Sequence, residues 1–126
     1  MDGPIRRLGQ VALPAQNIER AIAFYRDALG LPFIWSNGRM AFFQLGAVRL
    51  LIDLAEKPGG PRMASVLYLD TADLDAVVAA LKERGVVFRD DPHHIGDLGD
   101  LSVWMAFFHD SEGNLLALQE ERRRST

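Results

Sequence analysis

The chain has 126 residues, of which 48% are hydrophobic and 25% charged, values typical of one soluble globular domain. Its formal net charge of −3 excludes a globally basic nucleic-acid-binding protein. It contains no cysteine, which excludes disulfides, thiolate metal sites and cysteine nucleophiles.

The first half of the chain predicts the element order β-α-β-β-β. The short apolar segment Arg7–Ala15 is expected to be a strand. Asn17 is a good N-cap, and the apolar residues from Ile18 to Leu29 follow the spacing of one helix face. Gly30 suits the left-handed conformation that ends a helix. Three more strands are expected, with Asn37-Gly38 as a type I′ turn between the first two: Phe33–Trp35, Arg39–Leu45 and Val48–Leu54.

The second half predicts the same order after a linker-like stretch, residues 55–62. Met63–Leu69 is expected to be a strand, and Asp73 to cap a helix that Gly85 ends. The remaining prediction is a strand at Val86–Phe88, a long polar loop at Asp90–Asp100, and strands at Leu101–Phe108 and Leu115–Glu120.

An internal repeat accounts for this order. The letters Met-Ala-Phe-Phe occur at Met40–Phe43 and again at Met105–Phe108, and Leu-Leu follows each copy at the same distance, an offset of 65. The pattern predicts a single domain, residues 1–126, built of two repeats at about 5–55 and 63–121 with a linker at 55–62. Such a duplicated curved sheet would enclose a cleft.

Several segments together resemble the vicinal oxygen chelate superfamily, which includes glyoxalase I, bleomycin-resistance proteins and extradiol dioxygenases. They are Val11–Pro14 followed by Ile18–Tyr25, then Leu29–Leu31, and finally Phe108–Leu116 with its Asp-Ser-Glu-Gly-Asn turn. The resemblance implies an α+β fold of two tandem β-α-β-β-β units forming a curved mixed sheet. It also implies a homodimer and a ligand bound in the cup of the sheet.

The resemblance further implies positions for the ligands of a divalent metal ion, one on the first and one on the last strand of each unit. These positions fall on Gln10 and Ser65, and on Ile52 and Ala117. Only Gln10 is a plausible ligand, and Ile52 and Ala117 cannot coordinate a metal ion. A slip of one residue would bring Asp53 into place without repairing all four positions. We therefore expect no metal and no cofactor.

Other side chains leave alternatives open. Trp35 and Trp104 could stack on a flat ligand or pack in the core. His93 and His94 are candidates for a catalytic group that moves a proton, or they form a solvated pair in a loop. Arg39 and Arg49 could hold an anionic group or pair with nearby acids. His109 could be a surface residue beside a turn or, with the other two histidines, part of a metal site outside the family pattern. Arg122–Arg124 could form a frayed tail or a binding arm.

These observations favour a metal-free protein that binds a small apolar or aromatic molecule in the cup of the sheet. The residues expected to line this site are Gln10, Ile52, Ser65, Ala117, Trp104 and Trp35. Sequestration of a toxic compound would be its function. The alternative is a lyase, isomerase or dioxygenase that uses a displaced metal or a histidine base, and a third possibility is a non-catalytic module with a protein partner.

No stretch approaches the ~20 apolar residues of a membrane span, and the N-terminus lacks signal-peptide features. We expect a cytoplasmic protein without nucleic-acid or membrane partners.

Overall fold

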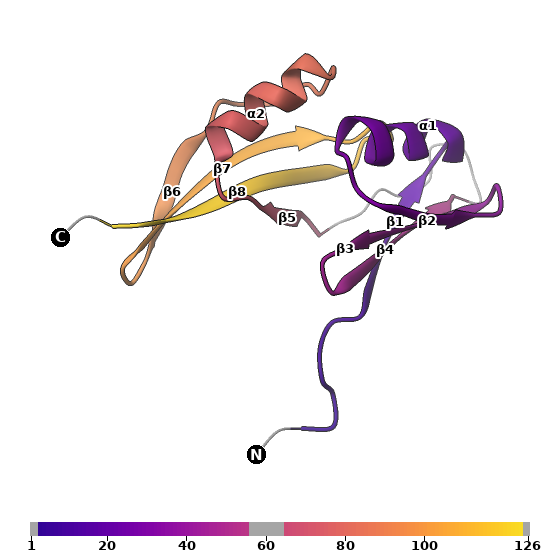
Figure 1. Cartoon of the computed structure of the whole chain (residues 1–126), viewed down its shortest axis with the longest axis horizontal. Coiled ribbons are helices and arrows are strands. Elements are labelled where there is room, and N and C mark those ends of the chain that lie inside the picture. Colours follow the sequence, from indigo (N-terminus) through magenta and orange to yellow (C-terminus); the bar gives the residue numbers. More distant parts are fainter. Residues whose placement is uncertain (1–2, 56–64, 125–126) are drawn as a thin grey trace. The chain divides into compact units, whose positions relative to one another are not determined.

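The computed structural model describes residues 3–55 and 65–124. The chain divides into two compact units, residues 1–62 and 63–126. Each unit has a four-stranded mixed sheet with a helix across one face (Figure 1). This confirms the predicted α+β fold of two repeated units. Apart from Ala55, the predicted linker lies outside the described residues.

The sheet of unit 1 has the strand order β1-β4-β3-β2. Strand β1 runs parallel to β4, whereas β3 pairs antiparallel with both β4 and β2. The strands are β1 (Gln10–Ala15), β2 (Phe33–Ser36), β3 (Met40–Leu45) and β4 (Val48–Leu54). Strand β1 is shorter than predicted, and β4 has the predicted bounds.

The helix of unit 1 begins as α1 (Ile18–Ile22) and continues as a π-helical segment (Ala23–Ala28). Its predicted start is confirmed, because Asn17 Oδ1 accepts a hydrogen bond from the Arg20 amide at 3.0 Å. Gly30 has φ 76°, as expected of the residue that ends the helix. The buried Tyr25 ring lies 5.9 Å from the Phe43 ring, centroid to centroid, which packs this helix on the sheet.

The turn between β2 and β3 differs from the predicted type I′ turn. That turn needs positive φ at both central residues, and in the described chain only glycines have positive φ. Gly38 has φ 90°, whereas the Asn37 side chain accepts hydrogen bonds from the amides of Arg39 and Met40, both at 2.9 Å. The asparagine therefore shapes the turn through its side chain rather than through its backbone.

The sheet of unit 2 has the strand order β5-β8-β7-β6 with the same pattern of pairing. Its helix, α2, runs from Leu74 to Glu83, and Asp73 caps it by accepting from the Ala76 amide at 3.2 Å. Gly85 follows with φ 90°. The strands are β5 (Leu67–Asp70), β6 (His93–Leu98), β7 (Leu101–His109) and β8 (Leu115–Arg123).

Two predictions for unit 2 are wrong. Val86–Phe88 is not a strand, since only Phe88 makes a single bridge, to Phe108. The strand lies instead at His93–Leu98, inside the segment expected to be a polar loop. This strand is at the edge of the sheet and pairs only with β7, so its polar side chains remain exposed and it needs no apolar alternation.

The offset of 65 between equivalent residues of the two repeats holds up to the hairpin that joins the last two strands of each unit, and it changes after that hairpin. Phe43 pairs with Leu50 across the β3–β4 hairpin, but Phe108 pairs with Leu116 across the β7–β8 hairpin. The second hairpin therefore contains one more residue. Beyond it the equivalent residues are 66 apart, so Leu51, and not Ile52, corresponds to Ala117. A shift of one residue moves a side chain to the other face of a sheet.

No helix within residues 3–55 and 65–124 has the length and apolar character to cross a membrane.

Candidate functional site

The four-stranded sheet of each unit has one face under the helix and one face opposite it, which we call the helix-free face. In unit 1 the helix side carries the fully buried residues, including Leu13, Phe43 and Leu50. Because successive side chains of a strand alternate, their neighbours point to the helix-free face. These neighbours include Gln10 on β1, Arg49 and Leu51 on β4, Phe42 on β3, and Trp35 on β2.

Four of these side chains contact one another in a row across all four strands of unit 1. Arg49 Nε donates to Gln10 Oε1 at 2.7 Å. The Arg49 guanidinium carbon lies 5.7 Å from the centroid of the Phe42 ring, a cation–π contact. The Phe42 and Trp35 ring centroids are 6.0 Å apart with an interplanar angle of 33°. Trp35 is 51% exposed, so the row ends in an accessible indole.

One end of this row borders a pocket of about 400 Å³. The pocket lies where the segment before β1 meets the β3–β4 hairpin. Its lining is polar and basic: Arg7, Gly9, Gln10, Gln44, Ala47 and Arg49. The helix-free face of unit 1 thus joins an aromatic surface to a positively charged pocket.

The helix-free face of unit 2 is also mainly apolar and aromatic. Ala117 lies there, paired with Tyr68 on one side and Phe107 on the other. The Tyr68 and Phe107 rings meet edge to face with centroids 6.4 Å apart, and Tyr68 is 50% exposed. Beside them, Gln119 Nε2 donates to Asp70 Oδ1 at 3.4 Å.

The residues that the sequence grouped into one site belong to different units and to different faces of their own sheets. Gln10 and Trp35 lie on the helix-free face of unit 1, and Ala117 lies on that of unit 2 at 0% exposure. Ile52 is 1% exposed and lies on the helix side, in the core of unit 1. Ser65 is exposed, two residues before β5. These placements leave Ile52 without access to a ligand.

Trp104 also lies on a helix side, that of unit 2, together with the buried Ala106 and Phe108. The Arg122 guanidinium carbon lies 4.3 Å from its ring centroid, and the ring centroid of His94 lies 5.6 Å away. The indole is therefore packed between side chains of its own unit. It does not share a face with Ala117.

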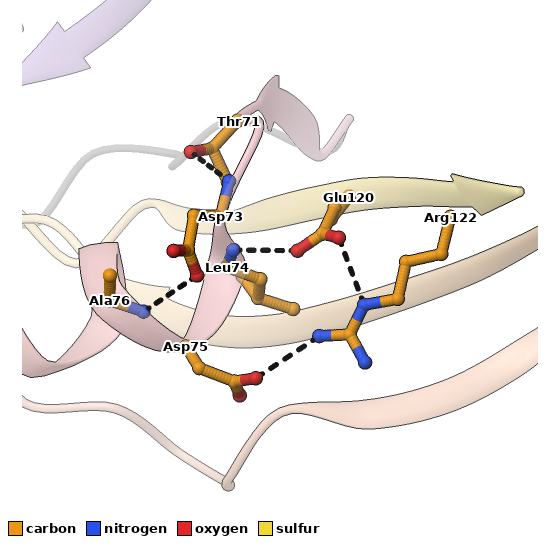
Figure 2. A network of polar contacts seen from close by, with 7 residues as sticks. All are labelled: Thr71, Asp73, Leu74, Asp75, Ala76, Glu120 and Arg122. Carbon is orange, nitrogen blue, oxygen red and sulfur yellow. Dashed lines mark hydrogen bonds and ion pairs between the residues drawn. The ribbon is translucent and has the colours of Figure 1, made fainter.

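Arg122 belongs to a polar network that ties the helix of unit 2 to its sheet (Figure 2). Arg122 Nε donates to Glu120 Oε2 at 2.9 Å, and Arg122 Nη2 donates to Asp75 Oδ2 at 3.2 Å. The other Glu120 oxygen accepts from the Leu74 amide at the start of α2, at 2.7 Å. The expected frayed tail of arginines is thus wrong for Arg122 and Arg123, which belong to β8.

The two candidate histidines lie on the exposed edge strand β6. His94 Nε2 lies 2.9 Å from Asp97 Oδ1, which also accepts from the Ser102 hydroxyl at 3.0 Å. The hydrogen bond with His94, and then that from Ser102, lower the pKa of Asp97 below its usual value of 3.8. His93 Nδ1 lies 2.9 Å from the Asp91 carbonyl oxygen. His94 lies on the helix side of the sheet, since it pairs with Trp104, whereas His93 pairs with Met105, a residue of the helix-free face of unit 2.

The residues at the positions implied for a metal ion do not fit one. The corrected register replaces Ile52 by Leu51 as the counterpart of Ala117, and both carry hydrocarbon. Their partners on the first strand of each sheet are Ala12 and Tyr68. Within the described ranges, no three His, Cys, Asp or Glu side chains gather as a metal-binding group. We therefore derive no reaction step through a metal.

The sequence alone does not single out several residues of this site, among them Phe42 and Arg7. In the sequence, Phe42 stands out only as part of the repeat, and Arg7 only as the start of a predicted strand. Strict alternation from the predicted hairpin would have placed Phe42 beside Leu51. Nothing in the local pattern indicates that Arg7 reaches the β3–β4 turn, where its guanidinium donates to the Ala47 carbonyl at 2.8 Å.

Comparisons with known proteins agree with this architecture. A sequence profile of the Glyoxalase/Bleomycin resistance protein/Dioxygenase superfamily matches residues 7–118. The chain is 27% identical over 126 residues to an uncharacterized protein, YraH, of Bacillus subtilis (strain 168), with 89% of this chain and 96% of that protein covered. It is 25% identical over 129 residues to catechol-2,3-dioxygenase of the same strain, covering 94% of this chain but 43% of that protein.

A solved structure shows the same fold at lower sequence identity. Lactoylglutathione lyase from Agrobacterium tumefaciens superposes with a TM-score of 0.74 at 21% identity, with 94% of this chain and 96% of that chain covered. At this identity the likeness is one of fold. The profile match spans most of the chain and includes both units, and the protein therefore belongs to the Glyoxalase/Bleomycin resistance protein/Dioxygenase superfamily.

Proposed function

We propose that the protein is a metal-free member of its superfamily that binds a small, largely apolar or aromatic molecule on the helix-free face of unit 1 and sequesters it. The observation that carries this proposal is the row from Gln10 through Arg49 and Phe42 to Trp35. An exposed indole beside a second aromatic ring is a surface on which a flat molecule can stack.

The apolar character of the equivalent positions in the two units supports the absence of a catalytic ion in this proposal. Leu51 and Ala117 supply neither nitrogen nor oxygen donors. A divalent cation needs such donors to offset its loss of hydration. At Leu51, on the helix-free face of unit 1, hydrocarbon favours an apolar ligand over a hydrated ion.

Titration with a panel of aromatic compounds, followed by intrinsic tryptophan fluorescence and calorimetry, tests the binding proposal. A ligand that stacks on the indole should lose about tenfold or more in affinity in Trp35→Ala, since an aromatic contact and its buried area are removed. Val87→Ala removes an apolar side chain that is 80% exposed in unit 2, and it should leave binding unchanged. A panel without any binder, or a Trp35→Ala variant with full affinity, would contradict the proposal.

Two similar proteins are named a catechol-2,3-dioxygenase and a lactoylglutathione lyase. For this reason an enzymatic activity is our second candidate function. Such an enzyme would use a displaced metal, or a histidine such as His94 as the base. Elemental analysis after exhaustive dialysis tests the version of this enzyme that uses a metal. A stoichiometric divalent ion would favour the enzyme and overturn the metal-free proposal.

We also propose a cytoplasmic homodimer without nucleic-acid partners. The lack of cysteine and the net charge of −3 support the location and the partner class. Sedimentation equilibrium of the purified protein tests the dimer, and a single species of 14.0 kDa would contradict it.

A further inference from the structure

Two arginines that line the unit 1 pocket have no acidic partner within residues 3–55 and 65–124. They are Arg7, before β1, and Arg49, on β4. In contrast, Arg26, Arg122 and Arg123 each form an ion pair with an aspartate. The pocket lining contains no carboxylate, so two positive charges face one cavity without compensation from the described chain. A guanidinium is always charged at physiological pH.

Both guanidinium groups are held in place by the protein itself. Arg7 Nη1 donates to the Ala47 carbonyl at 2.8 Å, which fixes it across the hairpin. Arg49 Nε donates to Gln10 Oε1 at 2.7 Å while its charged group lies over Phe42. In each arginine only part of the five-donor fork is used by these contacts. The remaining N–H groups are available to an oxyanion.

The amides in the pocket add to this arrangement. Gln10 uses its carbonyl oxygen for Arg49, so its NH₂ group remains a donor. Gln44 uses its NH₂ group for the Gly46 carbonyl at 2.6 Å, which leaves its oxygen as an acceptor. The pocket therefore offers mostly donors and positive charge, with one neutral acceptor.

We propose that this pocket binds a carboxylate, and that the ligand of unit 1 is a small aromatic carboxylate whose ring lies over Phe42 and Trp35. The carboxylate matches the planar fork of an arginine and can accept from it in a bidentate manner. Arg49 connects the two halves of the site, because it borders the pocket and contacts the Phe42 ring. This inference rests on the proposed function and narrows its ligand class.

Calorimetric titration with 2-naphthoate and its neutral isostere 2-naphthamide, near neutral pH and at equal ionic strength, tests the inference. The two probes share the aromatic body and differ in charge. The carboxylate should bind about tenfold to a hundredfold more tightly, as charge-assisted hydrogen bonds to it require. This preference should shrink in high salt, because the pocket is exposed to solvent.

Arg49→Gln and, separately, Arg7→Gln remove one charge while keeping a long polar side chain. Each should weaken 2-naphthoate about tenfold and leave 2-naphthamide nearly unchanged. Arg39→Gln is the matched control, an exposed arginine of the same unit outside the pocket lining, and it should have no effect. Gln44→Glu places a carboxylate in the pocket and should also weaken 2-naphthoate. Far-ultraviolet circular dichroism establishes that each variant is folded.

The outcomes separate this inference from the proposed function. Equal affinity for both probes, or equal losses in Arg39→Gln and Arg49→Gln, would overturn the carboxylate site while aromatic binding stands. Failure of both probes to bind the wild-type protein would overturn the carboxylate inference and count against aromatic binding. A selective loss of 2-naphthoate in both pocket variants supports the assignment.

Discussion

Asp97 is a single residue whose ionisation the surrounding hydrogen bonds favour. His94 and Ser102 both contact its carboxylate, and they lower its pKa in the folded protein below the value of 3.8 that it has in an unfolded chain. A depressed folded-state pKa stabilises the fold above pH 3.8, and this contribution disappears as the pH falls through the lower folded value. The lowered pKa of Asp97 therefore predicts that the protein loses stability on acidification.

Asp97→Asn should remove this contribution to the pH dependence. Urea unfolding at about pH 6 and about pH 3 gives the change in the free energy of unfolding for each protein. The difference between the two pH values should be smaller in the variant than in the wild type. Ser102→Ala removes one of the two hydrogen bonds and should give an intermediate difference. Identical pH dependence in all three proteins would contradict the assignment.

Between elements, the carboxylate of Glu120 joins helix α2 to strand β8. One oxygen accepts from the Leu74 amide, and the other accepts from Arg122 (Figure 2). Glu120→Ala leaves the partly buried helix amide and the guanidinium without this acceptor. We expect the free energy of unfolding to fall by about 2 kcal/mol. Urea denaturation measures this change.

The neighbouring residue supplies the control for that substitution. Glu121 is exposed and points to the helix-free face, so Glu121→Ala should change stability by less than about 0.5 kcal/mol. Equal losses in the two variants would show that helix docking does not depend on Glu120.

The elements that could be predicted from sequence are those with local signals. Asn17 and Asp73 cap their helices through their own side chains, and a cap needs only the next few residues. In contrast, β6 depends on its pairing with β7, and nothing in its polar sequence indicates this. The same limit explains why Val86–Phe88 was expected to be a strand, since its apolar residues match a strand pattern without a partner.

The candidate site was predicted in part, for a related reason. Gln10 and Trp35 do lie on one face of a sheet, since alternation along a strand is a local rule. The assignment of Ile52 depended on hairpin length, and one additional residue in the second hairpin reverses the face. The positions of Arg7 and Phe42 depend on contacts across 40 and 7 residues, to Ala47 and Arg49.

At the scale of the whole molecule, each unit contains its own core. Phe43 and Phe108 are equivalent and fully buried, each beneath the helix of its unit. Phe43→Ala and Phe108→Ala should each lower the free energy of unfolding by about 3–5 kcal/mol.

Amide hydrogen exchange should locate these losses. Phe43→Ala should speed exchange first in β1, β3 and β4, and Phe108→Ala first in β5, β7 and β8, because the lost contacts lie within one sheet. Uniform acceleration over both units in either variant would contradict separate cores.

The longer second hairpin has a consequence for how the two halves can be exchanged. A chimera that joins β3 to β8, or β7 to β4, keeps its apolar residues facing the core only if the crossover carries the hairpin that belongs to the second strand. A junction chosen at the constant offset of 65 would instead place Ala117 at the position of Ile52. It would turn every later side chain of that strand to the opposite face of the sheet. The junction tolerated by recombination is therefore set by the pairing of Phe43 with Leu50 and of Phe108 with Leu116.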